Sequence, residues 1–149
     1  MKKINEIFYS LQGEGLHAGT PAVFIRFSGC NLRCPFCDTE HQGGRMMSDE
    51  EIAGEAAKYP AEWIILTGGE PTLQLDEKLL GTLKKTGKKI AIETNGTRPV
   101  PAGVDFVTVS PKFQFCDNAE LKVTECDELK VVYLGQDLSQ YQGIAATHR

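Results

Sequence analysis

The sequence has 149 residues, and its 16 basic and 20 acidic side chains give a formal charge of −4. A chain of this length fits one domain, so we expect residues 1–149 to bury a single core. The acidic balance and the lack of a basic stripe argue against nucleic acid as a partner. No apolar run approaches the length of a membrane span, and no apolar signal-peptide core follows the basic start. We therefore expect a cytoplasmic protein without a membrane partner.

Apolar patterning in the first part of the chain predicts two strands and a helix. Residues 4–11 are expected to form a strand or an extended entry segment, and residues 23–27 a buried strand. Ser48 with Glu51 three positions later is a capping box, which predicts that a helix begins there, and Pro60 ends it.

The rest of the chain repeats this alternation. Leucines between residues 73 and 83, with Gly87 just past them, predict a second helix, whereas residues 100–103 are too rich in Pro and Gly for one. Four further apolar runs are predicted strands: residues 63–66, 89–92, 105–110 and 129–133. Strands that alternate with helices pair in parallel through right-handed crossovers. Because five or so strands cannot close an eight-stranded barrel, we expect an α/β fold, an open and incomplete parallel β/α barrel.

Three of the five cysteines lie in one short loop. Cys30, Cys34 and Cys37 follow the buried strand with C-x3-C-x2-C spacing, so their thiolates can converge on one metal centre. Iron–sulfur clusters and structural zinc ions normally have four ligands from the protein, so three thiolates leave one position open for another group. The alternative is a structural zinc site whose fourth ligand lies elsewhere, with His41 as the nearest candidate.

Cys116 and Cys126 lie far from that loop in the sequence. An odd number of cysteines with three of them clustered argues against a disulfide framework. We expect both residues to be buried as small apolar side chains.

Unusual polar motifs follow the other predicted strands. They are Thr-Gly-Gly-Glu-Pro at residues 67–71, Glu-Thr-Asn-Gly-Thr at 93–97 and Ser-Pro-Lys at 110–112. The carboxyl ends of parallel barrel strands form the rim where active sites lie, so these motifs and the cysteines mark one site. The paired glycines expose backbone at close range, and the Glu70 carboxylate can accept a hydrogen bond from an ammonium group.

Single residues add to this pattern. Arg26 lies in an apolar strand, so it must be paired: with a substrate carboxylate if it points inward, or in an ion pair if it points outward. Gly13 and Gly15 either let the backbone approach a ligand or form a surface hairpin turn. Lys112 is either a ligand contact or a solvated lysine.

Together these motifs resemble those of the radical S-adenosylmethionine (SAM) superfamily. Within it, residues 8–15, Arg26, the Cys37-Asp38-Thr39 sequence and the Ser110-Pro111-Lys112 sequence resemble the 7-carboxy-7-deazaguanine synthase family, over nearly the whole chain. The resemblance implies a [4Fe-4S] cluster, SAM and Mg²⁺ as cofactors. It also implies conversion of 6-carboxy-5,6,7,8-tetrahydropterin to 7-carboxy-7-deazaguanine with loss of ammonia, a lyase reaction of queuosine biosynthesis.

The resemblance also implies roles for individual residues. The cluster ligands are Cys30, Cys34 and Cys37, and the Mg²⁺ ligand is Thr39, which by itself would pass for a loop hydroxyl. The SAM contacts are Phe36, Cys37, Asp38, Gly69, Glu70, Ser110, Pro111 and Lys112. The substrate contacts are Leu11, Gln12, Gly13, Arg26, Thr67 and Glu93. As partners it implies a one-electron donor such as flavodoxin or ferredoxin, and a homodimer.

The chain departs from the family pattern at its end. Family members continue through another strand and a closing segment, and we expect residues 1–149 to be a radical SAM domain that lacks them. Two other functions remain as alternatives. A glycyl-radical-enzyme activase shares the three-cysteine loop but would lack a small-molecule pocket, against which Gln12, Arg26 and Thr39 argue. A zinc-binding interaction module would need no catalysis.

Overall fold

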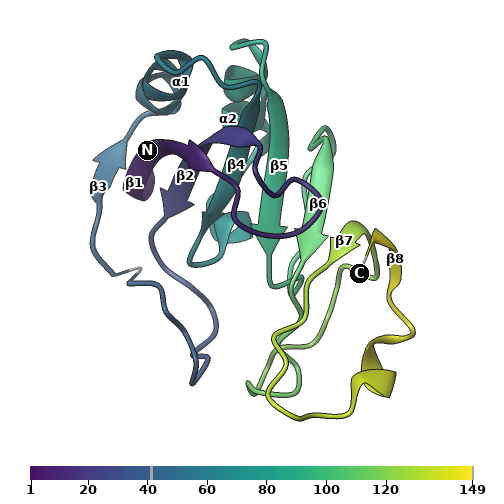
Figure 1. Cartoon of the computed structure of the whole chain (residues 1–149). Coiled ribbons are helices and arrows are strands. Elements are labelled where there is room, and N and C mark those ends of the chain that lie inside the picture. The colour runs from purple at the N-terminus through teal and green to yellow at the C-terminus, as the bar shows by residue number, and fades with distance from the viewer. Residues whose placement is uncertain (41, 149) are drawn as a thin grey trace.

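The computed structural model describes residues 1–40 and 42–148. One eight-stranded sheet runs through it in the order β3-β1-β2-β4-β5-β6-β7-β8 (Figure 1). The antiparallel part consists of β1 (Lys2–Leu11), β2 (Pro21–Phe27) and β3 (Arg45–Met47). From β2 onward the pairing is parallel, through β4 (Trp63–Gly68), β5 (Lys89–Thr94), β6 (Phe106–Val109), β7 (Glu125–Leu129) and β8 (Ala145–His148). β3 and β8 lie at opposite ends of this order, so the predicted open parallel barrel is confirmed.

Two helices begin at the capping signals in the sequence. At α1 (Asp49–Ala57), the Ser48 hydroxyl accepts a hydrogen bond from the Glu51 backbone N–H at 3.1 Å. The Glu51 carboxylate accepts one from the Ser48 N–H at 2.7 Å, so the predicted capping box is confirmed. The second helix, α2 (Glu77–Lys84), begins after a separate short 3-10 helix at Pro71–Leu73. In the described chain no helix has the length and apolar composition needed to cross a bilayer.

The two faces of the sheet have different coverings. Because side chains alternate along a strand, β2 directs Val23, Ile25 and Phe27 to one face, where they pack with residues of both helices. Ala22 and Phe24 point to the other face and pack with Ile65, Ala91 and neighbouring aromatic rings. The segment between β1 and β2 crosses this second face in front of β4, β5 and β6 (Figure 1). We call residues 12–20 the crossing segment.

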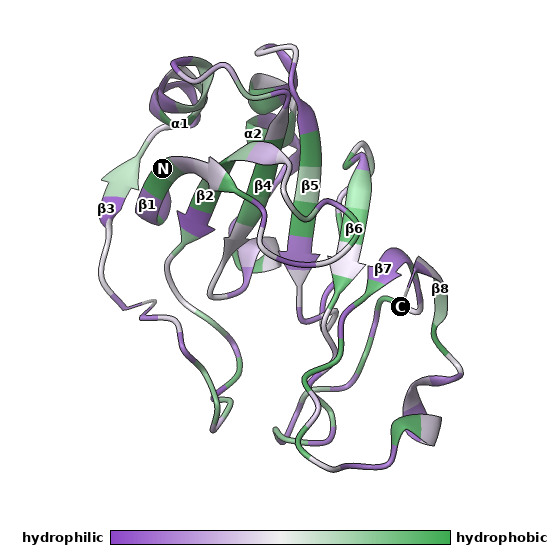
Figure 2. Ribbon diagram, viewed as in Figure 1, coloured by the Kyte–Doolittle hydropathy of each residue, from purple (hydrophilic) through white to green (hydrophobic). Residues whose placement is uncertain are grey.

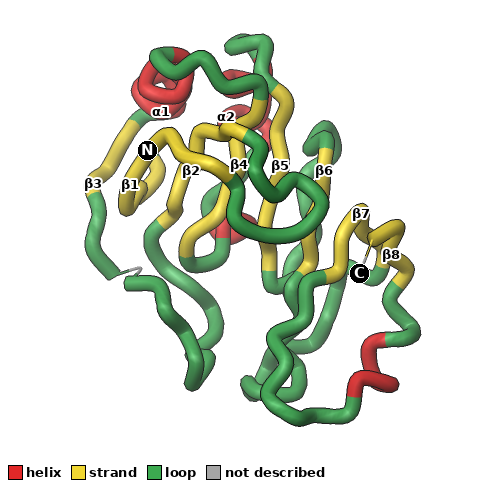
Figure 3. The backbone as a smooth tube through the Cα atoms, in the orientation of Figure 1, coloured by secondary structure: helices red, strands yellow, loops and turns green. Residues whose placement is uncertain are grey.

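The loops after the parallel strands gather at one end of the sheet. Figure 2 shows β2 and β5 turning from green to purple toward their carboxyl ends, where hydrophilic residues replace the apolar core. Figure 3 shows that the long loops of the chain lie beyond that end. The motifs that follow the strands therefore share one rim, as the sequence predicted.

The sequence-based strand prediction is wrong near the carboxyl terminus. A strand was expected at residues 129–133, but β7 ends at Leu129. Its position follows from pairing with the short β6, which sets Thr108 opposite Glu128 and Val109 opposite Leu129. A further strand, β8, was not predicted, and it pairs in parallel with β7.

Substituting Ser48→Ala tests the cap at α1. The change removes an N-cap acceptor, which typically costs about 1 kcal/mol and lowers the melting temperature of a chain of this size by roughly 2–4 °C. Thermal unfolding followed by circular dichroism measures the shift. Ser10→Ala, at an exposed position of β1, is the control and should melt like the unaltered chain. Equal melting of both variants would show that the cap does not stabilise the fold.

Candidate functional site

The three clustered cysteines line one open cavity. The loop after β2 carries them, and its first residue is fixed by a hydrogen bond from the Ser28 N–H to the Lys3 carbonyl at 3.0 Å. Cys30, Cys34 and Cys37 all border a cavity of about 670 Å³. The three thiols thus share one space, and their binding to a common metal centre stays a prediction.

The shape of this cavity fits a large inorganic group. A zinc ion needs its ligands within about 2.3 Å. In the described residues no three His, Cys, Asp or Glu side chains gather tightly enough to enclose an ion. The three thiols border a wide space, which has room for a [4Fe-4S] cluster with a bound ligand. Burial raises the pKa of the Cys30 thiol, and the negative charge of Glu70 adds to the shift. His41, the fourth ligand of the zinc alternative, lies outside the described residues.

The Gly-Gly-Glu motif after β4 lies directly against the cysteine loop. The Gly69 N–H donates to the Phe27 carbonyl at 3.0 Å, and the Glu70 N–H donates to the Gly29 carbonyl at 2.8 Å. A side chain at residue 69 would overlap the Gly29 carbonyl, so only glycine permits this backbone approach. The motif is thereby held beside Cys30.

The Glu70 carboxylate joins two strand ends. It is 1% exposed, and a buried carboxylate must be hydrogen-bonded to be tolerated. One oxygen accepts from the N–H and the hydroxyl of Thr72 and from the Thr94 hydroxyl, at 2.6 to 3.1 Å. The other accepts from the Asn95 N–H at 2.8 Å. The bonds from Thr94 and Asn95 fix the loop after β4 to the end of β5, and those from Thr72 lie within that loop.

Two asparagines that sequence reasoning missed extend this connection. The Asn95 side chain donates to the Asn31 side-chain oxygen at 3.0 Å, and the Asn31 amide donates to the Thr97 hydroxyl at 2.8 Å. Asn31 lies between two predicted cluster ligands, so the bonds fix the cysteine loop to the loop after β5. The signal that could have revealed them is their position in the sequence, inside the three-cysteine loop and the Glu-Thr-Asn-Gly-Thr motif.

The Ser-Pro-Lys motif after β6 does not border the cavity of the three cysteines, but its lysine lies close enough to Cys34 for the two side chains to interact electrostatically. The Ser110 N–H donates to the Thr94 carbonyl at 2.8 Å, and the Lys112 ammonium donates to the Ser110 carbonyl at 2.8 Å. Burial lowers the pKa of Lys112, which is partly withdrawn from water, and its contact with a ligand stays a prediction. Phe36 and Phe115 meet edge to face with ring centroids 4.9 Å apart, which joins the cysteine loop to this segment.

The expectation for Cys116 is wrong. Its thiol is half-buried, not enclosed in the apolar core, and it donates a hydrogen bond to the Cys34 sulfur at 3.2 Å. The tertiary fold thus brings a fourth cysteine to the three-cysteine loop. Cys126 is buried in the cluster formed with Val109 and Leu129, as expected.

A row of polar side chains crosses the sheet near the carboxyl ends of its parallel strands. Arg26 of β2 pairs in register with Thr67 of β4, whose hydroxyl donates to the Glu93 carboxylate of β5 at 2.8 Å. Glu93 is opposite Thr108, which is opposite Glu128. We call these five residues the polar row. Arg26 itself donates to Glu6 at 2.7 Å, so it points to a partner on β1.

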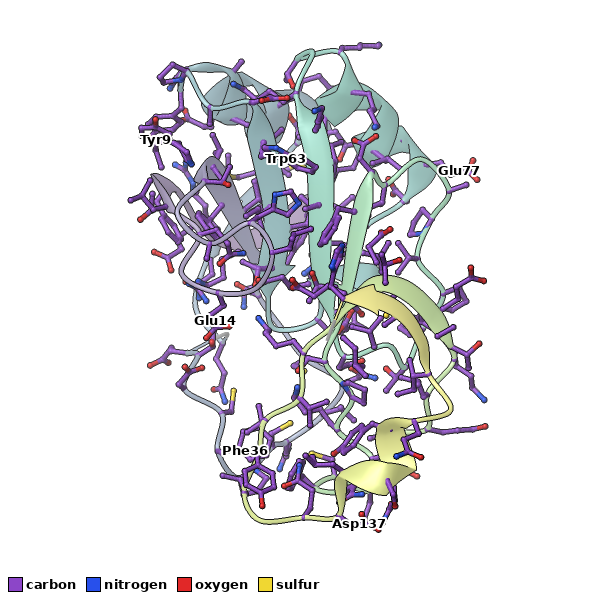
Figure 4. All side chains as sticks on the ribbon, turned by 45° about the vertical axis from the view of Figure 1, so that its right-hand side comes forward. Tyr9, Glu14, Phe36, Trp63, Glu77 and Asp137 are labelled. Atoms are coloured by element: carbon purple, nitrogen blue, oxygen red, sulfur yellow. The ribbon has the colours of Figure 1, made fainter. Side chains whose placement is uncertain are left out.

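The crossing segment is attached to the polar row by three interactions. Gln12 donates to Glu93 at 3.1 Å, and the Leu16 N–H donates to Glu128 at 2.6 Å. Lys130, just past β7, pairs with Glu93 at 3.4 Å and with Glu14 at 2.9 Å. Glu14 is labelled in Figure 4. Burial acts to lower the pKa of Lys130, but Glu93 and Glu14 outweigh it and raise that pKa. Sequence reasoning missed Lys130 and Glu128 because the register that places them was not known.

Beneath the crossing segment lies a small inner cavity of about 20 Å³. Its lining includes Glu93, Glu128 and the ring of His17, which lies 4.6 Å from both the Trp63 and the Phe106 rings. His17 Nε2 is buried and has no hydrogen-bond partner in the described chain.

The predicted Mg²⁺ ligand lies near the predicted carboxylate-binding arginine. Thr39 and Arg26 border one cavity of about 340 Å³, together with Asp38. The Thr39 hydroxyl donates to the Asp38 carboxylate at 3.2 Å. The two remaining predicted substrate contacts are Leu11 and Gly13, the sequence neighbours of Gln12, and both are exposed.

Comparison with known proteins agrees with this geometry. Residues 24–112 match the model of the radical SAM superfamily, so the open parallel barrel with its three-cysteine loop is a radical SAM domain. A 7-carboxy-7-deazaguanine synthase of Bacteroides thetaiotaomicron is 60% identical over 148 residues, which cover 99% of this chain and 79% of that protein. One from Nitratidesulfovibrio vulgaris is 42% identical, over 98% of this chain and 78% of its own.

A solved structure shows the same likeness. The crystal structure of QueE from Escherichia coli superposes with a TM-score of 0.76 at 32% identity, over 87% of this chain and 70% of that one. Within the radical SAM superfamily, the chain belongs to the 7-carboxy-7-deazaguanine synthase family.

Substituting Gly69→Ala tests the close approach of the Gly-Gly-Glu motif to the cysteine loop. The new methyl group overlaps the Gly29 carbonyl, so the two loops must separate. We expect this separation to cost about 1.4 kcal/mol of the binding free energy of SAM, which raises its dissociation constant about tenfold. Equilibrium dialysis with labelled SAM on the reconstituted protein measures it. Gly81→Ala in α2 meets no neighbour and is the control, which should bind SAM normally. Normal binding by Gly69→Ala would contradict the assigned contact.

Substituting Lys130→Met tests the attachment of the crossing segment. Two ion pairs worth up to about 1 kcal/mol each are lost, so amide hydrogen exchange at residues 12–16 should be up to roughly thirtyfold faster. Because the pKa of Lys130 is raised above its ordinary value, the effect is present at pH 7–9 and fades only as pH rises through that raised pKa. Lys122→Met, which removes an exposed pair with Glu120, should leave this segment unchanged.

Proposed function

We propose that this protein is a 7-carboxy-7-deazaguanine synthase, which converts 6-carboxy-5,6,7,8-tetrahydropterin to 7-carboxy-7-deazaguanine with loss of ammonia in queuosine biosynthesis. The class of reaction is inferred from membership of the family. The observation in the structure that most supports this substrate is the polar row. It offers a guanidinium at one end and carboxylates at its centre and its other end, which suits a pterin with a carboxylate on one side and ring N–H groups on the other.

The cluster cavity and the surrounding loops would hold the cofactors. Cys30, Cys34 and Cys37 would ligate three irons of a [4Fe-4S] cluster, and together with SAM this cluster supplies one-electron chemistry that the chain itself lacks. Phe36, Asp38 and the Gly-Gly-Glu motif would contact SAM, and so would Ser110, Pro111 and Lys112. The Glu70 side chain is already used by four donors, so its contribution is to position the backbone of Gly69.

The polar row would orient the substrate. The bond to Glu6 uses one of the five N–H donors of Arg26, and the others suit a bidentate bond to the substrate carboxylate. Glu93, which already binds Thr67 and Gln12, would accept from ring N–H groups. Mg²⁺ keeps several waters and often bridges a protein oxygen to a ligand oxygen, so Thr39 and the substrate carboxylate are suited to share one.

The crossing segment would have to move for the substrate to enter. An inner cavity of about 20 Å³ holds roughly one water-sized group, far less than the 300–1,000 Å³ of typical small-molecule sites. Leu11, Gln12 and Gly13 lie where this segment begins. We infer that substrate displaces the segment from Glu93 and that His17 Nε2, which lacks a partner here, gains one from the ligand.

The same proposal includes the partners. One-electron chemistry needs a donor such as flavodoxin or ferredoxin, and the family resemblance suggests a homodimer. A cytoplasmic setting is consistent with the thiols of the cysteine loop, because cytosolic thiols are kept reduced. The single continuous sheet supports the interpretation of residues 1–149 as one radical SAM domain.

The proposal is tested by reconstituting the protein anaerobically with iron and sulfide, reducing it with dithionite and supplying SAM and 6-carboxytetrahydropterin. We expect chromatography to detect 7-carboxy-7-deazaguanine, in larger amount with Mg²⁺. Cys34→Ala should abolish it, and Glu93→Gln should raise KM for the pterin about tenfold through the loss of roughly 1.4 kcal/mol of binding. Formation of 5′-deoxyadenosine without the deazaguanine would keep the radical SAM class and reject this substrate.

A further inference from the structure

A fourth cysteine lies against one of the three cluster ligands. The Cys116 and Cys34 sulfurs are 3.2 Å apart, although 82 positions separate them in the sequence. Both thiols are free and half-buried. Nothing in the proposed reaction uses Cys116, because the three-cysteine loop and SAM complete the cluster without it.

Two contacts hold this pair in place. The Cys116 and Phe115 backbone N–H groups both donate to the Lys112 carbonyl, at 3.0 and 2.9 Å, so the turn that carries Cys116 is hydrogen-bonded. Phe115 packs edge to face on Phe36, two residues after Cys34. Figure 4 shows Phe36 at the end of the molecule where several sulfur atoms gather. The approach of the two sulfurs therefore follows from the packing of two separate loops.

We propose that Cys34 and Cys116 form a reversible disulfide in the cluster-free protein. The sulfurs need to close from 3.2 Å to the roughly 2.0 Å of a disulfide bond. Cys34 cannot take part while it binds iron, so the modification is restricted to the protein before cluster assembly or after cluster loss. This inference rests on the proposed role of Cys34 as a cluster ligand.

The oxidant is a small disulfide such as oxidised glutathione. One cysteine, as its thiolate, attacks the small disulfide, which forms a mixed disulfide and releases one glutathione thiolate. The other cysteine loses its proton and attacks the protein sulfur of that mixed disulfide, releasing the second glutathione thiolate. Two protein thiols are oxidised, one small disulfide is reduced to two thiols, and the two protons go to the released thiolates.

The consequence is protection of a ligand at the cost of a delay in cluster loading. A thiol that is oxidised to the sulfinic acid is lost, whereas a disulfide is returned to two thiols by a reductant. While the bond exists, the cavity offers two cysteine ligands instead of three. Reduction is then a condition for cluster assembly.

The cluster-free protein gives a direct test. It is incubated anaerobically with oxidised glutathione, alkylated and digested with trypsin, which cleaves after Arg33, Arg45, Lys112 and Lys122. Mass spectrometry should find peptide 34–45 joined to peptide 113–122, with fragmentation placing the bond at Cys34. The number of thiols that the alkylating reagent modifies in the denatured protein should fall by two.

Two variants separate this pair from general thiol oxidation. Cys126→Ser removes the other cysteine outside the loop and should form the joined peptide as the unaltered chain does. Cys116→Ser should form no joined peptide, and Cys116→Ala is a second variant in case the serine disturbs folding, which circular dichroism checks. Oxidised protein should take up less iron until dithiothreitol is added, whereas oxidised Cys116→Ser should load normally.

Other outcomes would overturn the inference. They are a bond from Cys116 to Cys30 or Cys37, a bond within the loop alone, or no bond at all in the unaltered chain. Because the peptide masses are read without iron, a protein that joins Cys34 to Cys116 but never binds a cluster would contradict the proposed function and leave the disulfide established.

Discussion

The site depends on one buried carboxylate and the backbone contact beside it. Glu70 accepts bonds from Thr72, Thr94 and Asn95, while its own N–H and that of Gly69 bond to the end of β2 and the loop after it. A carboxylate removed from water is costly unless its oxygens are occupied, so these bonds leave the loops few alternatives. Three strand ends are thereby fixed together, and the cysteine loop starts from a rigid base.

Parallel pairing then determines which side chains can act together. Neighbouring parallel strands place residues of the same layer side by side, which brings Arg26, Thr67 and Glu93 into one row although they lie far apart in the sequence. Charges of both signs alternate with hydroxyls along this row. A flat ligand with a carboxylate at one end and hydrogen-bond donors at the other can therefore be bound by strands, which are more rigid than loops.

The helix-free face of the sheet is covered by the crossing segment. Its attachments through Gln12, Leu16 and Lys130 are polar, and His17 adds ring contacts, whereas the opposite face is sealed by an apolar helix layer. Polar contacts of this kind can exchange for contacts to a ligand with little net loss, because each group keeps a partner. The same face that closes the inner cavity can thus admit a substrate.

The sequence by itself did not reveal β3, but it determined the strands β2, β4, β5 and β6, the capping box of α1, the cysteine loop and the motifs at the strand ends. Each of these depends on local patterning: period-two or continuous apolar runs, cap residues and glycine turns. The tertiary structure alone decided the position of β7 and the presence of β8, the attachment of Lys130 and Glu128, and the pairing of Cys116 with Cys34. These depend on strand register and on the packing of loops distant in the sequence, and neither leaves a local pattern in the residues concerned.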